Sequence, residues 1–342
     1  MLVHRASAAR RALARKSSSA PMLRIVFAGT PAFALPALEA LVSSAHQLVG
    51  VLTQPDRPAG RGRTLHASPI KERALQLGLP LAQPLRLASE EPLASLREWA
   101  PELVVVVAYG LILPPAVLAL PRLGSLNIHA SLLPRWRGAA PIQRAILAGD
   151  AQSGVSIMQL DAGLDTGPVY AQRELAVGDG VTSAELHDVL APLGAALLMK
   201  VIADLELGHA HARAQPATGV TYAAKLDKGE ALIDWNQSAA HIAAQVCACN
   251  PWPVAETTLN ATQLRLWRAR ASAPAAAPTT PASSDAAPAT VPGTVLGLRG
   301  EVLRVACGSG VLEVAELQSA GRRRLSARDF AHGHVGAGLR FG

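Results

Sequence analysis

The sequence lacks several features that would point to particular classes of protein. It has three cysteines in 342 residues, which argues against a disulfide scaffold and suits a reducing compartment. Cys247 and Cys249 form a C-x-C pair without a second pair, so we expect no zinc site. No apolar run approaches the roughly 18 residues that a membrane span requires, and residues 103–113 form too short a run. We therefore expect a cytoplasmic protein that binds neither a metal nor a membrane.

An excess of positive charge is also missing from most of the chain, although the net charge is +7. Residues 1–21 contain five basic residues and no acid, residues 22–229 contain 17 of each, and residues 230–342 contain 10 basic and 8 acidic residues. Because the body is nearly neutral, a polyanionic partner would have to be bound by local clusters of arginine. The neutral body does not separate a monomer from a dimer; we expect a monomer.

A glycine-rich dinucleotide-binding fingerprint is absent. Residues 23–27 form an apolar run typical of a buried strand, Ala28-Gly29-Thr30-Pro31 a tight turn, and residues 33–43 a helix. This start is typical of a doubly wound α/β domain, but one glycine stands where the fingerprint needs three. A nicotinamide-dependent enzyme is therefore disfavoured.

The first 21 residues, rich in Ala, Arg and Ser, have no apolar period long enough to pack. They allow three interpretations: a transit peptide, a disordered tail, or an upstream start codon before a true start at Met22. We favour the last, because the first predicted strand follows Met22 at once.

The most informative stretch runs from Gly124 to Gln143. Its start alternates, with an apolar set on one face and the polar residues Asn127, His129 and Ser131 on the other. A core strand with satisfied polar groups is the alternative, but three polar residues in register favour a site at the carboxyl end of a strand. A later loop, Asp161-Ala-Gly-Leu-Asp165-Thr-Gly-Pro168, also follows a predicted strand. Asp161 is explained equally well as a turn residue, so Asp165 is the sharper catalytic candidate.

Arginine gathers in two places. Arg57, Arg61 and Arg63 lie in a Pro- and Gly-rich loop after a predicted strand, where guanidinium groups suit phosphate contacts. Residues 322–324 are three further arginines in a predicted turn of the C-terminal part: Arg322, Arg323 and Arg324. A solvated turn and a nucleic-acid contact explain this second cluster equally well.

The predicted fold class is α/β, with an N-terminal Rossmann-like doubly wound sheet and a small C-terminal OB-like β-barrel. We expect a catalytic domain over residues 22–208, a linker over residues 209–229 without periodicity, and the barrel domain over residues 230–342. An Ala/Pro/Thr-rich stretch, residues 272–290, is predicted to be a flexible insertion between two barrel strands.

An amide, an imidazole and a carboxylate suit acyl transfer between two bound substrates, since no serine elbow or cysteine nucleophile accompanies them. Asn127 can donate to a developing oxyanion, His129 can deliver a proton to a leaving nitrogen, and Asp165 can sustain the imidazolium. Residue types alone leave the acyl group open.

The stretch from Asn127 to Ile142, together with Gly163-Leu-Asp165-Thr-Gly167, resembles the folate-dependent formyltransferases. Further stretches, Phe27-Ala-Gly-Thr-Pro31, Thr53 to Gly62 and Asn250-Pro-Trp-Pro253, resemble members of that family that act on initiator methionyl-tRNA. The resemblance begins near residue 22 and reaches the end of the chain.

The resemblance implies that Asn127, His129 and Asp165 form the catalytic trio and that four consecutive residues line the tetrahydrofolate site: Ser131, Leu132, Leu133 and Pro134. It implies 10-formyltetrahydrofolate as the formyl donor, initiator methionyl-tRNA as the acceptor, and Arg61 as the key residue of a loop that enters the tRNA acceptor end.

The sequence departs from the family pattern at Ala32, where an acid is usual, and at Cys247 and Cys249, where an Arg and a Phe are common. Two alternatives remain open. A formyltransferase or deformylase for a small molecule would need neither the arginine-rich loop nor the barrel. A non-catalytic RNA-binding protein would have no use for the Asn, His and Asp.

Overall fold

The computed structural model describes residues 22–59, 64–272, 290–334 and 339–342. The chain divides into two compact units. The first contains the chain up to Ile128 with Ile157–Ala162 and Ala195–Arg213; the second contains His129–Ser156, Gly163–Gly194 and Ala214–Gly342. Residues 1–21 and residues 273–289 of the predicted insertion lie outside the described residues, so those two predictions are not tested.

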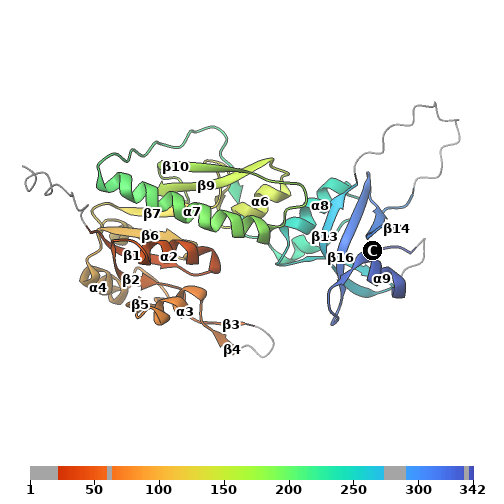
Figure 1. Cartoon of the computed structure of the whole chain (residues 1–342), viewed down its shortest axis with the longest axis horizontal. Helices are drawn as coiled ribbons and strands as arrows, with labels where there is room; N and C mark the ends of the chain where they lie inside the picture. The colour runs from red at the N-terminus through yellow and green to blue at the C-terminus, as the bar shows by residue number, and fades with distance from the viewer. Residues whose placement is uncertain (1–21, 60–63, 273–289, 335–338) are drawn as a thin grey trace, which may run out of the picture. The chain divides into compact units, whose positions relative to one another are not determined.

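The first sheet has seven strands in the order β10-β9-β7-β6-β1-β2-β5 (Figure 1). They are β1 (Arg24–Gly29), β2 (Gln47–Leu52), β5 (Leu81–Ala82), β6 (Leu103–Val107), β7 (Ser125–His129), β9 (Gln152–Gln159) and β10 (Val169–Ala176). Strand β1 pairs in parallel with β2 and with β6, and β6 pairs in parallel with β7. All five residues of β6 are buried, as expected for a central parallel strand. The predicted α/β sheet is confirmed.

Short helices connect these strands. They are η1 (Ala32–Ala34), α2 (Leu35–Val42), α3 (Pro69–Gln76), α4 (Glu90–Trp99), α5 (Pro115–Leu118) and α6 (Pro141–Leu147). Helix α3 begins where the Ser68 hydroxyl accepts a hydrogen bond from the Lys71 amide, which satisfies one of the free N–H groups of its first turn. Gly50 lets the sheet approach the ring of Trp99, because a Cβ at this position would overlap that ring.

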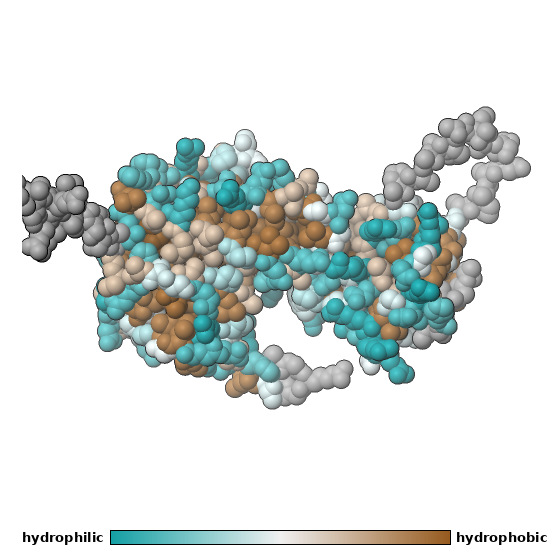
Figure 2. Space-filling model, in the orientation of Figure 1, coloured by the Kyte–Doolittle hydropathy of each residue, from teal (hydrophilic) through white to brown (hydrophobic). Residues whose placement is uncertain are grey.

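Helix α7 (Ser183–Glu206) begins with a capping box, of which the sequence signature is Thr182-Ser-Ala-Glu185. The Thr182 hydroxyl accepts from the Glu185 amide at 3.2 Å, and the Glu185 carboxylate accepts from the Thr182 amide at 2.9 Å. Among the described residues, α7 alone is long and apolar enough to cross a membrane, but 44% of its most apolar stretch is buried in the protein. Apolar residues gather along α7 on the face shown in Figure 2.

The sequence did not predict every element. The arginine-rich loop contains two short antiparallel strands, β3 (Arg57–Ala59) and β4 (Thr64–His66). Strand β10 was missed because its central residues are exposed and charged, as befits an edge strand. Two-residue strands β8 (Arg137–Gly138) and β11 (Tyr222–Ala223) pair in parallel with each other, and β11 falls inside the segment predicted as a linker.

The second sheet is antiparallel, in the order β12-β13-β16-β15-β14, with β17 beside β16. Its strands are β12 (Ala255–Leu259), β13 (Thr262–Ala271), β14 (Val295–Arg299), β15 (Val302–Ala306), β16 (Val311–Ser319) and β17 (Leu325–Ser326). Helices η2 (Lys228–Ala231), α8 (Ala239–Ala248) and α9 (Ala327–His334) accompany it (Figure 1). Asn260 and Ala261, both with positive φ, form the two-residue turn between β12 and β13.

The last residues of the chain join the two edges of this sheet. Phe341 bridges to Leu259 at the end of β12, and Arg340 bridges to Thr294 just before β14. The Phe341 ring also packs on Trp235 with 5.5 Å between the ring centroids. The sheet therefore closes on itself as a small barrel does, while the narrower OB-like assignment remains a prediction.

Candidate active site

The polar face of β7 is buried at the end of the strand. Asn127 is 9% exposed, His129 is 5% exposed, and Ser131, just after the strand, is 2% exposed. Among the described residues, the side-chain amide of Asn127 makes no hydrogen bond, and its backbone lies opposite Val106 of β6. The predicted strand is confirmed, and the role of the Asn127 amide stays a prediction.

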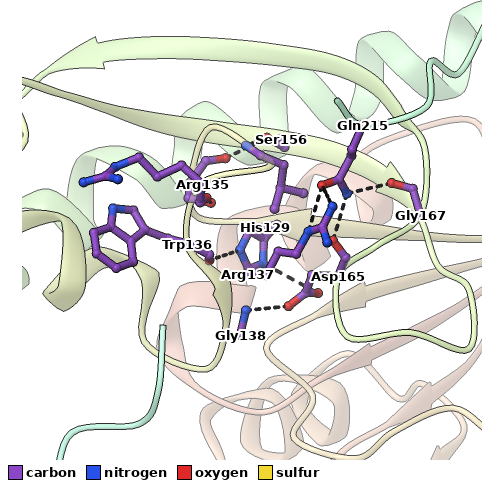
Figure 3. Close-up of polar contacts among 11 residues, drawn as sticks. His129, Arg135, Trp136, Arg137, Gly138, Ser156, Asp165, Gly167 and Gln215 are labelled. Atoms are coloured by element: carbon purple, nitrogen blue, oxygen red, sulfur yellow. Dashed lines mark hydrogen bonds and ion pairs between the residues drawn. The ribbon is translucent and has the colours of Figure 1, made fainter. Parts of the chain in front are cut away.

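His129 is anchored by a backbone carbonyl. Its Nε2 lies 2.8 Å from the carbonyl oxygen of Trp136 (Figure 3). A carbonyl oxygen can only accept a hydrogen bond, so Nε2 carries a proton and Nδ1 is the nitrogen left for chemistry. Trp136 has φ +64°, an unusual value for a bulky residue, and this conformation belongs to the turn that presents its carbonyl.

The structure brings Asp165 to the free nitrogen of His129. Asp165 Oδ1 lies 3.8 Å from His129 Nδ1, and the two side chains are 13% and 6% exposed. The other carboxylate oxygen accepts a hydrogen bond from the Gly138 amide at 2.8 Å (Figure 3). Asp165 itself has φ +53°, in the left-handed region that non-glycine residues rarely occupy. Two predicted catalytic residues from distant parts of the sequence thus meet.

Two further residues hold this arrangement and were missed from the sequence. Arg137, 9% exposed, donates from Nε and Nη2 to Gln215 Oε1 at 3.0 and 2.7 Å. Gln215 Nε2 donates to the carbonyl oxygens of Asp165 and Gly167, both at 2.8 Å. Gln215 lies in the predicted linker, where a single polar residue without periodicity gives no signal.

The predicted linker that contains Gln215 also runs beside the loop that follows β7. Thr221 accepts from the Trp136 amide through its hydroxyl and from the Arg137 amide through its carbonyl, at 2.8 and 2.9 Å. The Ala223 carbonyl accepts from the Ala139 amide at 2.9 Å. Gly138 must be glycine here, because it has φ +118° and a Cβ would lie 2.8 Å from the Ala223 oxygen. Residues 221–223 therefore belong to the site.

An ion pair supports the turn from its other side. Asp150 accepts hydrogen bonds from Arg135 at 2.6 and 2.8 Å and from the Trp136 indole at 2.7 Å. Burial alone would raise the pKa of Asp150, but the hydrogen bonds from Arg135 and Trp136 outweigh it and lower this pKa. The guanidinium of Arg135 lies 4.4 Å from the centre of the Trp136 ring. These three side chains line a cavity of about 290 Å³ together with Ser131 and Leu132.

The four residues predicted to line the folate site form a turn that hydrogen bonds hold in place. The Ser131 hydroxyl donates to the Arg135 carbonyl at 2.6 Å, and the Ser131 carbonyl accepts from Ser156 at 2.6 Å. The Ser156 hydroxyl also accepts from the Leu133 amide at 3.1 Å. Leu133 is buried, whereas Leu132 and Pro134 are partly exposed. Their contact with folate remains a prediction.

The predicted tRNA-binding arginines fall into three groups. Arg57 is exposed and donates to Gln54 Oε1 at 2.9 Å, while Arg61 and Arg63 lie outside the described residues. The three arginines near the end of the chain are all exposed: Arg322, Arg323 and Arg324. The guanidinium of Arg324 lies 3.1 Å from the centre of the ring of Trp267, a buried residue, so a cation–π contact holds this arginine against the protein.

Metal ligands do not gather in the described part of the chain, where no three His, Cys, Asp or Glu side chains come together as a metal site would require. The three cysteines are buried and free, and burial raises the pKa of each thiol to about 11. A thiolate nucleophile is therefore disfavoured at these positions.

Comparisons with known proteins agree with this geometry. Residues 23–202 match the formyl transferase family, and residues 225–335 match its C-terminal domain. The methionyl-tRNA formyltransferase of Methylococcus capsulatus is 50% identical over 320 residues, which cover 94% of this chain and 100% of that protein. The methionyl-tRNA formyltransferase of Chromohalobacter salexigens is 51% identical over 310 residues, which cover 90% of this chain and 92% of that protein.

The fold also resembles solved structures of low sequence identity. HypX from Aquifex aeolicus has a TM-score of 0.61 at 16% identity, over 92% of this chain and 49% of that one. An N-formyltransferase from Helicobacter canadensis, solved with folinic acid and dTDP-3-aminofucose, has a TM-score of 0.61 at 16% identity, over 87% of this chain and 100% of that one. By the family match over residues 23–202 and the high identity to full-length relatives, the chain belongs to the formyl transferase family.

Proposed function

We propose that the protein transfers the formyl group of 10-formyltetrahydrofolate to the α-amino group of initiator methionyl-tRNA. The observation that carries the proposal is the 50% identity to a methionyl-tRNA formyltransferase over 94% of this chain. The buried pair of His129 Nδ1 and Asp165 Oδ1, 3.8 Å apart, gives that likeness a chemical basis. The names of the relatives support the acceptor, and the motifs that carry the resemblance support both the acceptor and the donor.

In the proposed reaction, the neutral α-amine of the aminoacyl-tRNA attacks the formyl carbon. A tetrahedral oxyanion forms, and the side-chain amide of Asn127 donates a hydrogen bond to it. Asn127 is 9% exposed and its amide has no other partner among the described residues, so it is not diverted by the protein. Such a donor is worth about 3–4 kcal/mol of the barrier.

His129 then assists departure of the folate nitrogen. With Nε2–H held by the Trp136 carbonyl, Nδ1 is the nitrogen that exchanges the proton. Asp165 stabilises the imidazolium across a space of 3.8 Å, too long for a direct hydrogen bond and suited to a water that relays the proton of the attacking amine. No covalent intermediate is required, because orienting two substrates already removes much of the barrier.

For the acceptor, we propose contacts from the arginine-rich sequence that contains Arg57, Arg61 and Arg63 and from the exposed arginines 322–324. Charge supports this assignment, since the rest of the body is nearly neutral and these are its densest basic clusters. Four consecutive residues, Ser131, Leu132, Leu133 and Pro134, are proposed to contact the folate. We further propose a monomeric protein.

A formylation assay with the full chain tests the proposal. Purified protein is given 10-formyltetrahydrofolate and either initiator or elongator methionyl-tRNA, and formylmethionine released from the tRNA is measured. We expect formylation of the initiator alone. Consumption of formyltetrahydrofolate without formylmethionine would point instead to a small-molecule acceptor or to hydrolysis. No consumption at all would contradict an enzymatic role.

A further inference from the structure

Gln215 uses its whole side-chain amide to tie two parts of the site together. Its Oε1 accepts two hydrogen bonds from Arg137, and its Nε2 donates two, to the carbonyls of Asp165 and Gly167 (Figure 3). We propose that Gln215 is a positioning residue for the transfer reaction, which holds the Asp165 loop so that the carboxylate faces His129. The inference rests on the proposed function, because it gives Asp165 its role there.

The Asp165 loop needs such a support. Asp165 has φ +53°, and a non-glycine residue stays in this region only where its surroundings fix it. The Gly138 amide holds one carboxylate oxygen, but it does not restrain the backbone of the loop. The Gln215 side chain donates hydrogen bonds to the loop backbone on both sides of Thr166.

The orientation of the Gln215 amide is fixed by its partners. The guanidinium of Arg137 can only donate, so it must face Oε1, and the two carbonyl oxygens can only accept, so they must face Nε2. Arg137 is 9% exposed and has no carboxylate within ion-pairing distance among the described residues. Its charge therefore polarises the amide, which strengthens the two bonds that Nε2 donates.

The substitution Gln215→Glu should keep the contact with Arg137 and remove the contacts with the carbonyls of the Asp165 loop. The new carboxylate still accepts from Arg137, and as an ion pair it does so more strongly. On the other side it places an oxygen against the carbonyls of Asp165 and Gly167, so the hold on the loop is lost. We expect kcat to fall by about 10²-fold, the usual scale for a catalytic group displaced by about 1 Å. The KM values for folate and tRNA should not change, since Gln215 is neither among the residues proposed to contact the folate nor among the arginines proposed to contact the tRNA.

The chain offers a matched control in Gln245. This residue is 7% exposed, and its Nε2 also donates to two backbone carbonyls, those of Glu230 and Leu232, at 2.7 and 2.9 Å. It lies on α8, with no bond to the catalytic residues. Gln245→Glu should lower the melting temperature as much as Gln215→Glu does, while the kcat of the folded protein stays at the wild-type value.

A spectroscopic readout distinguishes positioning from a general loss of structure. We expect the ¹⁵N resonance of His129 Nδ1 to shift in Gln215→Glu and in the neutral variant Gln215→Met, because Asp165 moves away from it. The chemical shift of His129 Nε2 should not change, since its hydrogen bond to the Trp136 carbonyl is not altered by the substitution. Gln245→Glu should change neither resonance.

Three results would overturn the inference. The first is a kcat for Gln215→Glu no lower than that of Gln245→Glu. The second is a loss confined to KM. The third is a fall in kcat with the His129 Nδ1 resonance unchanged. Failure of the wild-type protein to formylate methionyl-tRNA would instead reject the proposed function, while the resonance measurement would still report whether Gln215 places Asp165.

Discussion

The polar side chains at the end of strand β7 and those in the interior of the C-terminal barrel differ in their hydrogen-bond partners. In the barrel and its helix α8, the buried Gln245, Thr257 and Glu313 all have partners; the Thr257 hydroxyl, for example, accepts from the Trp235 indole at 2.9 Å. On β7 the side-chain amide of Asn127, a residue that is 9% exposed, has no hydrogen-bond partner among the described residues. An unpaired amide beside His129 can be satisfied by a ligand, which supports the proposed oxyanion contact; the barrel has an unpaired polar atom too, Nε of Arg304 on β15, but no catalytic candidate lies on that strand.

Backbone conformation separates the two regions in the same way. In the barrel, the positive φ values of Asn260 and Ala261 are those of a two-residue hairpin turn. Next to β7, Trp136 and Asp165 adopt positive φ without a hairpin and are held by side-chain and backbone hydrogen bonds. The C-terminal part has one such residue outside a hairpin, Val254 with φ +69° just before β12, so the two regions differ in what the unusual backbone positions: at the end of β7 it places the Trp136 carbonyl and the Asp165 carboxylate beside His129.

The largest expected effect comes from removing the three proposed catalytic side chains at the end of β7, which have no equivalent in the barrel. Asn127→Ala, His129→Ala and Asp165→Ala should each abolish measurable turnover, since one oxyanion donor alone is worth about 10²–10³-fold in kcat. Single-turnover formyl transfer measures the rate, and thermal melting shows whether the fold is intact. Near-normal turnover in any of the three would remove that residue from the mechanism.

A substitution inside the barrel should reverse the pattern. Phe341 is 1% exposed and packs on Trp235 where the chain end joins the edges of the sheet. Phe341→Ala should lower the free energy of unfolding by about 3–5 kcal/mol, as other large-to-small core changes do. Urea unfolding gives this value, and the kcat of the fraction that remains folded should stay the same. A fall in kcat at saturating tRNA would show that the barrel also contributes to the chemical step.

The arginines on the barrel surface should contribute to tRNA binding and not to the rate of formyl transfer. Arg323→Ala should weaken tRNA binding and reduce the slope of log K against log salt by about 1, if this guanidinium meets a phosphate. Arg328→Ala is the matched control, because Arg328 is already paired with Glu301 at 2.8 Å. Filter binding at several salt concentrations measures both slopes. Equal slopes in the wild type and Arg323→Ala would support the solvated-turn interpretation.

Much of the fold follows from local patterns in the sequence. Continuous apolar runs predict the buried strands β1 and β6, and the alternation from Leu126 to Ser131 predicts β7 with its polar face. The Thr182–Glu185 capping box predicts the start of α7. These signals are readable because each depends on residues close together in the chain.

The support of the site does not follow from such patterns. Gln215 acts through carbonyl oxygens about 50 residues earlier in the sequence, and a carbonyl is present at every residue. Trp136 holds His129 through its backbone, so its side chain carries no sign of that role. Strands β8 and β11 are two residues long and exist only because they pair with each other. Sequence therefore predicts the reacting groups better than the groups that hold them.

The smallest expected effect concerns a contact between α7 and the barrel strand β13. Arg268 on β13 and the Glu185 carboxylate at the start of α7 form an ion pair at 2.5 Å. The pKa of Glu185 is lowered to about 2, first by the Thr182 amide and then by Arg268 and the Thr182 hydroxyl. A carboxylate whose pKa is lower in the folded state adds stability above its unfolded pKa, near 4.5, and loses it as the pH falls toward 2.

Glu185→Gln should therefore flatten the loss of stability between pH 4.5 and pH 2. The Glu185 side chain is 45% exposed, so solvent screening limits its contribution to about 0.2–1 kcal/mol. Urea unfolding across this pH range measures the effect, and Arg268→Met provides the comparison. Because the Thr182 amide is the largest cause of the shift, Arg268→Met should remove only part of the pH dependence. Full loss of that dependence in Arg268→Met would mean that the ion pair to the barrel outweighs the capping box. An unchanged dependence in Glu185→Gln would show that neither contact matters to acid stability.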